Sequence, residues 1–176
     1  MANGTLKVGE ITTSTGSGNI TIGSGVTLQS NVPAFEAYLS SDQSVSDNVT
    51  TKVQVDTEVF DSDDCYDNST NYRFTPTKAG KYFVYAKVSC DVNANSAMSQ
   101  MMTLIYKNGS VYSQSIYNYA VNFGREGTPY IGTVIDMNGT TDYLELFGQN
   151  DVNSGSATFN GGTQRFTLFG AYKVGI

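Results

Sequence analysis

Residues 66–88 read YDNSTNYRFTPTKAGKYFVYAKV, and this stretch gives the strongest indication of the fold. Its second half, 80–88, is apolar on both faces for most of its length and is rich in aromatic and β-branched residues, which suit a pleated, buried surface. Such a run predicts a central strand of a sheet. Pro76 and Gly80 frame the turn that precedes this strand.

Short apolar or alternating runs follow one another on both sides of this stretch, at intervals typical of β-sandwiches and jelly rolls. In one of them Val53, Val55 and Val59 alternate with polar residues. Asn108-Gly109 and Asn138-Gly139 each separate two such runs, and Asn-Gly predicts a two-residue hairpin turn of type I′. The sequence therefore predicts an all-β sandwich. Its other predicted strands are 34–39, 51–60, 101–106, 111–117, 130–135, 142–147 and 165–174.

The 176 residues divide near residue 31. All 21 aromatic residues, 12 Tyr and 9 Phe, lie at or after Phe35. The first 30 residues are rich in Gly, Ser and Thr and show only short apolar alternations, which bury too little surface to stand alone. We predict an N-terminal attachment arm, 1–30, followed by a head domain, 31–176; a flexible linker is the alternative for 1–30. The apolar arm residues are Leu6, Val8, Ile20, Ile22, Val26 and Leu28.

Composition argues against several classes of function. The formal net charge is −6 and the ten Lys and Arg are scattered singly, which argues against nucleic acid as a partner. The chain has no His, the commonest general base and zinc ligand, and no phosphate-binding Gly-rich loop. No segment resembles a secretory signal or a membrane span. We therefore expect no enzymatic activity, no cofactor and no membrane insertion, and synthesis in a cytoplasm.

Several motifs in the head resemble the complement-type globular head and the tumour necrosis factor superfamily. The Tyr66–Thr70 segment resembles that family's Tyr-Asp-x-Ser-Thr-Gly loop, Arg73–Pro76 its Phe-Thr strand, and Gly80–Val84 its aromatic-rich strand. Pro33-Ala34-Phe35, Lys107-Asn108-Gly109 and Phe166-x-x-Phe169 follow the family order, so the resemblance covers about residues 33–174. The chain departs from the pattern at Asn71 and Leu168, where Gly is usual, and Tyr72 is an extra residue.

The resemblance implies a jelly roll of about ten strands that assembles as a homotrimer through aromatic and aliphatic contacts. Large rings that one core of this size does not absorb favour the same conclusion, because Tyr and Phe are enriched at subunit contacts. The alternative is that these rings fill a single sandwich. The candidate trimer contacts are Tyr82, Val84, Tyr112, Tyr117, Tyr119 and Phe123.

The N-terminal run GSGNITIGSGVTL (16–28) resembles segments of bacteriophage fibre and appendage proteins. It implies a small phage virion protein whose arm binds other virion proteins and whose knob lies at the virion surface. We expect a capsid decoration or head fibre. The alternatives are a tail-fibre or receptor-binding tip that recognises a host-surface glycan or protein, and a secreted module that is similar to tumour necrosis factor or binds carbohydrate.

One acidic segment and two cysteines complete the candidate sites. Carboxylates are concentrated between Asp56 and Asp67 with no Lys or Arg among them, and Ca²⁺ prefers such oxygen ligands. The spacing is not that of an EF-hand, so a solvated acidic loop is favoured over a calcium site. Cys65 and Cys90 are expected to be ordinary thiols, with a disulfide as the alternative. The calcium candidates are Asp61, Asp63, Asp64 and Asp67.

Overall fold

Antiparallel strands form three sheets in the computed structural model, which describes residues 24, 32–121 and 123–175. No helix occurs in these residues, so the all-β prediction is confirmed. All the strands lie in one of the two units into which the chain divides, Asn31–Ile176. The predicted arm residues, Leu6 to Leu28, lie outside the described residues.

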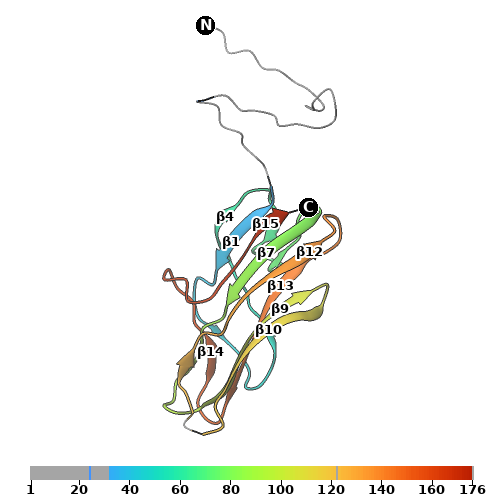
Figure 1. Cartoon of the computed structure of the whole chain (residues 1–176). Coiled ribbons are helices and arrows are strands. Elements are labelled where there is room, and N and C mark those ends of the chain that lie inside the picture. The colour runs from blue at the N-terminus through green and yellow to red at the C-terminus, as the bar shows by residue number, and fades with distance from the viewer. Residues whose placement is uncertain (1–23, 25–31, 122, 176) are drawn as a thin grey trace. The chain divides into compact units, whose positions relative to one another are not determined.

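The first sheet, called here the β7 sheet, has the strand order β12-β7-β15-β1-β4 (Figure 1). The predicted central strand 80–88 is β7, and it pairs with β12 on one side and β15 on the other, so its central position is confirmed. The five strands are β1 (Ala34–Tyr38), β4 (Thr57–Asp61), β7 (Gly80–Lys87), β12 (Tyr130–Met137) and β15 (Leu168–Gly175).

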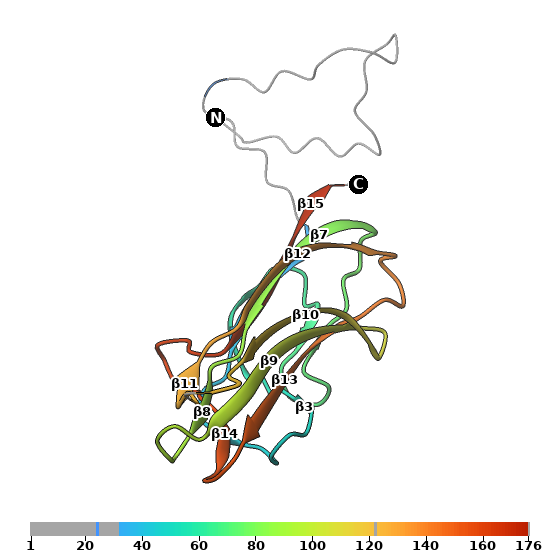
Figure 2. The ribbon, with the colours of Figure 1, turned by 60° about the horizontal axis from the view of Figure 1, so that its bottom comes forward.

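The second sheet, the β9 sheet, has the order β10-β9-β13-β6-β5, and β3 also pairs with β13. Figure 2 shows β9, β10 and β13 as one layer and β7, β12 and β15 as the other. The strands are β3 (Thr51–Lys52), β5 (Tyr66–Asp67), β6 (Arg73–Phe74), β9 (Met98–Lys107), β10 (Ser110–Asn118) and β13 (Leu144–Val152).

A smaller third sheet with the order β11-β8-β14-β2 lies at the end of the sandwich away from the end of β15 (Figure 1). Its short strands continue the two layers and close the core at that end. They are β2 (Gln43–Ser44), β8 (Cys90–Val92), β11 (Glu126–Gly127) and β14 (Ala157–Phe159).

Aromatic rings from both layers form the centre of the core. Phe35 of β1 is fully buried and stacks on Tyr66 of β5, with ring centroids 4.4 Å apart, and on Phe74 of β6 at 4.8 Å. Phe169 of β15 meets the Phe35 ring edge-on at 5.1 Å. These offset and edge-on contacts are the favoured arrangements of aromatic pairs. The motif residues of the sequence therefore join the β7 sheet to the β9 sheet.

The two Asn-Gly predictions have opposite outcomes. Asn108 and Gly109 have φ values of 52° and 79° and connect the antiparallel pair β9–β10, so this hairpin is confirmed. The hairpin at Asn138-Gly139 is wrong, because β12 and β13 belong to different sheets. Only Gly139 has a positive φ there, 70°, and the connection crosses from one layer to the other.

The predicted strand 51–60 is also divided between the layers. Its first two residues form β3 in the β9 sheet, and its last four fall in β4 of the β7 sheet. Val53 and Val55 are buried, as their alternation predicts, but Val59 is 38% exposed. The chain crosses between the layers after Val55, so a single alternation does not continue through the whole run.

Candidate functional site

The outward surface of the β7 sheet carries a group of large side chains, which we call the aromatic face. Its members come from three neighbouring strands and lie in register: Val134 is opposite Phe83, and Phe83 is opposite Tyr172. Several are about half exposed, with 54% for Tyr130 and 46% for Tyr172. The aromatic face consists of Phe83, Tyr85, Tyr130, Val134, Tyr172 and Val174.

The rings of the aromatic face contact one another across the strands. The Phe83 and Tyr172 centroids are 5.6 Å apart, and Tyr85 lies 6.2 Å from Phe83. Tyr85 is flanked in register by Gly132 and Gly170. A Cβ on Gly170 would clash with the Tyr85 ring, so the ring occupies the space above bare backbone. Because these glycines have no side chains, the Tyr85 ring lies close to the backbone of the neighbouring strands.

A polar group borders the aromatic face on β1. The Tyr85 hydroxyl donates to Oε2 of Glu36 at 2.8 Å, and Arg165 donates to Oε1 at 2.7 Å. The Arg165 guanidinium also lies over the Tyr38 ring, 6.0 Å from its centroid. Burial, followed by the hydrogen bond to Glu36, raises the pKa of Tyr85, so this phenol stays protonated as a donor. We call Tyr85, Glu36 and Arg165 the Glu36 triad.

A second apolar surface follows β10, which ends the β9 sheet and pairs only with β9 among the described strands. No residue of β10 is charged, although charges are the usual protection of an open strand edge. We call this surface the β10 edge. Its exposed members are Val111 (49%), Tyr112 (48%), Ile116 (37%) and Tyr117 (44%).

The predicted trimer contacts have mixed outcomes. Tyr82 and Val84 are fully buried in the core, so their assignment to a subunit contact is wrong. Tyr112 and Tyr117 are exposed on the β10 edge, and Phe123 is 37% exposed after that strand. Tyr119 is partly buried and packs against the core.

The outward residues Phe83 and Tyr85 were missed because a strand that is apolar on both faces does not show which face is inward. The two lysines of the strand carry the missing signal. Lys81 and Lys87 share the parity of Phe83 and Tyr85, and a charged side chain marks the face directed to solvent.

Two of the candidate calcium ligands, Asp61 and Asp67, stabilise their own loops by accepting backbone hydrogen bonds. Asp61 Oδ2 accepts the backbone N–H groups of Cys65 and Tyr66, both at 2.8 Å. Asp67 accepts those of Ser69, Thr70 and Asn71 between 2.9 and 3.0 Å. Asp63 accepts the Thr77 hydroxyl, and Asp64 lies in the turn with a φ of 51°. In the described part of the chain, no three His, Cys, Asp or Glu side chains are placed to hold a metal ion.

A polar pocket of about 430 Å³ opens beside this loop. Hydrogen bonds from Thr70 and Ser69 lower the pKa of Asp67, whereas desolvation, with Asp61 and Asp64 nearby, raises the pKa of Glu58. The Arg73 guanidinium lies 4.7 Å from the Tyr143 ring centroid, and no carboxylate pairs with it among the described residues. The pocket is lined by Glu58, Asp64, Cys65, Tyr66, Asp67, Asn68, Ser69, Asn71, Arg73 and Thr75.

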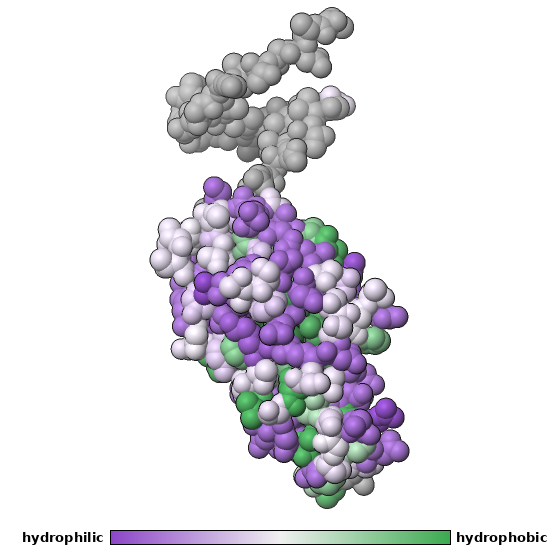
Figure 3. Space-filling model, turned by 180° about the vertical axis from the view of Figure 1, so that it is seen from behind, coloured by the Kyte–Doolittle hydropathy of each residue, from purple (hydrophilic) through white to green (hydrophobic). Residues whose placement is uncertain are grey.

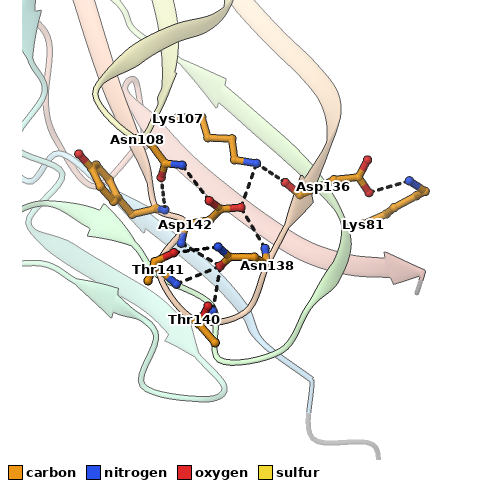
Figure 4. A network of polar contacts seen from close by, with 9 residues as sticks. Lys81, Lys107, Asn108, Asp136, Asn138, Thr140, Thr141 and Asp142 are labelled. Carbon is orange, nitrogen blue, oxygen red and sulfur yellow. Dashed lines mark hydrogen bonds and ion pairs between the residues drawn. The ribbon is translucent and has the colours of Figure 1, made fainter.

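A network of polar contacts joins the turn after β9 to the β12–β13 connection (Figure 4). Asp142 accepts from Lys107 at 3.0 Å, from the Asn108 amide at 2.8 Å and from the Asn138 N–H at 3.0 Å. The hydrogen bond from Asn108 is the main reason that the pKa of Asp142 is lowered. Asn138 Oδ1 accepts three backbone N–H groups of the same connection. This network fixes the crossing between the layers.

Both cysteines are free thiols and buried, which agrees with the expectation of ordinary thiols. Burial raises the pKa of Cys65, and it raises that of Cys90 to about 12. Neither thiol has the lowered pKa of a reactive cysteine.

The remaining surface is mixed in character. Seen from behind, it is largely hydrophilic, and hydrophobic residues form small separate areas (Figure 3). Within the described residues, no helix has the length and apolar character needed to cross a membrane.

Comparison with known proteins identifies the architecture. No family model matches the sequence, and no curated protein matches it. Solved structures do match. Murine APRIL at pH 5.0 aligns with a TM-score of 0.58 and 12% identity, covering 81% of this chain and 99% of that one. The globular domain of zebrafish complement 1qA aligns with a TM-score of 0.57 and 11% identity, covering 81% and 97%.

The Eiger TNF of S. frugiperda is a third neighbour, with a TM-score of 0.56, 8% identity and coverage of 82% and 94%. The chain has the jelly-roll fold of these proteins. That result confirms the predicted fold class and the resemblance at the level of architecture. At these identities the likeness concerns the fold alone.

Proposed function

We propose that this chain is a non-catalytic structural protein whose head assembles as a homotrimer through the aromatic face. The observation that carries the proposal is the exposure of four large side chains of the aromatic face, Tyr130, Val134, Tyr172 and Val174, beside the partly buried rings of Phe83 and Tyr85. A contiguous apolar surface of this kind marks a site of protein contact. Rings that already pack in pairs offer a large area at little cost in side-chain entropy.

The β10 edge supplies the complementary surface in this proposal. Each copy then carries two different apolar patches, one on a sheet face and one on a strand edge. When unlike patches meet, the contact is heterologous and closes into a ring if the rotation permits. A ring of three in which the β10 edge of one copy covers the aromatic face of the next uses both patches. It also buries the unpaired backbone groups of β10.

In this proposal, the trimer lies at the surface of a phage virion. The support is the resemblance of residues 16–28 to phage appendage segments, together with a knob that carries exposed loops. The arm 1–30 binds other virion proteins and the knob decorates the capsid. The absence of His from the sequence supports a structural rather than a catalytic role.

Immunogold labelling of phage particles purified from the source culture tests this role, with an antibody against residues 32–175. Label spread over the capsid supports a decoration protein or head fibre, and label confined to the tail supports the tail-tip alternative. If denaturing mass spectrometry of the same particles finds no peptide of this chain, the virion proposal is overturned.

Recognition of a host-surface glycan is a second candidate function, and the polar pocket beside β5 favours it. Sugar hydroxyls both donate and accept hydrogen bonds, and the pocket offers Arg73 as a donor and Glu58 and Asp64 as acceptors. Because carboxylates outnumber the one guanidinium there, a neutral sugar fits better than an anionic one. Binding of the wild-type chain to a neutral glycan on an array, lost in Arg73→Gln, supports this candidate; equal binding by both proteins excludes the pocket.

A further inference from the structure

We propose that Arg165, held in place by Glu36, is the residue that recognises the neighbouring copy, and that its free N–H groups donate to the unpaired backbone carbonyls of the β10 edge. This inference rests on the proposed assembly through the aromatic face. It adds a polar specificity element to a contact that is otherwise apolar.

The first step concerns where the Glu36 carboxylate lies. Glu36 is opposite Gly170 in β15 and opposite Phe60 in β4, and Gly170 is in turn opposite Tyr85. The carboxylate therefore stands in a row of otherwise uncharged positions across the β7 sheet. Its side chain is only 18% exposed, so most of its hydration is already lost in the single chain.

The second step is that both carboxylate oxygens of Glu36 already accept hydrogen bonds within the same copy. One oxygen accepts the Tyr85 hydroxyl and the other accepts Arg165. A buried charge is costly mainly when it lacks hydrogen-bonded partners. A second copy can therefore cover Glu36 without leaving an unpaired anion, and the role of Glu36 is to position the guanidinium.

The third step concerns the groups that Arg165 keeps free. A guanidinium has five N–H donors, and the structure gives the Arg165 side chain one hydrogen bond, to Glu36. The Arg165 side chain is 45% exposed, so a second copy can reach it. A row of neutral backbone acceptors fits these donors, and the open side of β10 presents such a row without any charged side chain.

The backbone of Arg165 is a separate indication. Its φ is 55°, in the left-handed region that favours glycine, and its N–H closes a turn onto the carbonyl of Gly162. Strained positions of this kind occur preferentially at functional sites. A glycine would adopt this backbone conformation with less strain. The presence of an arginine therefore indicates that its side chain has a role beyond forming the turn.

The test compares Arg165→Gly with Arg125→Gly in the full chain by sedimentation equilibrium. Arg125 is the matched control, because it also pairs with a carboxylate, Asp91, at 3.7 Å and belongs to neither patch. We expect Arg165→Gly to weaken trimer formation at least tenfold, and Arg125→Gly to leave the trimer unchanged. Arg165→Lys, which keeps the charge but loses the planar fork, is expected to lie between them.

Hydrogen exchange supplies a second measurement, with a readout besides mass. Amide protection of β10 is expected to rise on trimer formation in the wild type and to rise less in Arg165→Lys. The lysine variant retains a side chain at this turn, so the test does not depend on the glycine variant folding. If the wild type forms a trimer and all three variants have the same dissociation constant as the wild type, the inference is overturned and the proposed assembly is not. A wild-type chain that stays monomeric overturns both the inference and the proposed assembly.

Discussion

At the residue scale, the centre of the molecule is Phe35. Its ring contacts Tyr66, Phe74 and Phe169 and therefore joins both layers. We predict that Phe35→Ala destabilises the chain by about 3–5 kcal/mol, because it removes buried area and leaves a cavity between the sheets. Urea unfolding of the single chain measures this. The control is Phe60→Ala, whose ring is 46% exposed, with an expected cost below about 1 kcal/mol. Equal costs for the two variants would contradict the assigned core.

Asp67 provides a pH-dependent test at the same scale. Hydrogen bonds from the turn lower its pKa below the ordinary value of 3.8, so its contribution to stability is present above that pH and is lost as the pH falls below it. Asp67→Asn is expected to cost about 1–2 kcal/mol at pH 7, and the gap to the wild type is expected to close as the pH falls below 3.8.

Urea unfolding at several pH values between 7 and 2.5 gives this gap directly. Asp64→Asn, exposed in the neighbouring turn, is the control and is expected to stay within about 0.5 kcal/mol of the wild type at pH 7. A gap for Asp67→Asn that stays constant or widens at low pH contradicts the assigned role.

The sequence shows which residues are large and apolar, but it does not show which face of the sheet each side chain points to. Tyr82 and Phe83 are neighbours in one apolar run, yet the first is in the core and the second is on the aromatic face. A side-chain period of two makes every such assignment depend on register, which pairing fixes. The parity of Lys81 and Lys87 marks the outward face of this strand, but the predicted trimer contacts did not take it into account.

At the scale of elements, the β9–β10 turn is the connection that the sequence predicted correctly. Gly109 has a φ of 79°, and its ideal Cβ would meet only the Tyr143 hydroxyl, at 3.5 Å. The cost of a side chain there is therefore conformational rather than steric. We predict that Gly109→Ala destabilises the chain by about 1–2 kcal/mol, whereas Ser110→Ala, in the adjacent exposed position, changes stability by less than about 0.5 kcal/mol. Thermal unfolding of both variants checks this, and a neutral Gly109→Ala would contradict the left-handed turn.

Two other elements show what a sequence pattern leaves open. Asn138-Gly139 has the composition of a tight hairpin, but Asn138 uses its side chain to cap three N–H groups of a longer connection between the layers. The 51–60 run likewise alternates like one strand and changes layers after Val55. Long-range pairing decided both cases, and local composition does not encode it.

At the scale of the whole molecule, the fold was predicted from the motif order between Pro33 and Phe169, whereas the candidate interaction surface required the structure. The aromatic face combines residues from β7, β12 and β15, which come together only through pairing of distant segments. The polar pocket likewise brings Arg73 near Glu58 across a loop whose shape is set by Asp67. No spacing in the sequence specified either set.

A charge placed on the aromatic face tests its role in assembly. We predict that Val134→Asp weakens the trimer roughly a hundredfold or more, because the carboxylate would be buried without a partner in the contact. Val49→Asp is the matched control, since Val49 is 49% exposed against 48% for Val134 and lies outside both patches. Sedimentation velocity over a range of concentrations compares the two. Dissociation by both variants to the same extent would argue against a specific role for this face.

The most direct test of the central claim is the mass of the full chain in solution, by sedimentation equilibrium at micromolar concentration. Assembly through the aromatic face and the β10 edge predicts three times 19.0 kDa, about 57 kDa, with reversible dissociation on dilution. A mass of 19.0 kDa at every concentration would show that both apolar surfaces remain open to solvent, and would contradict the account.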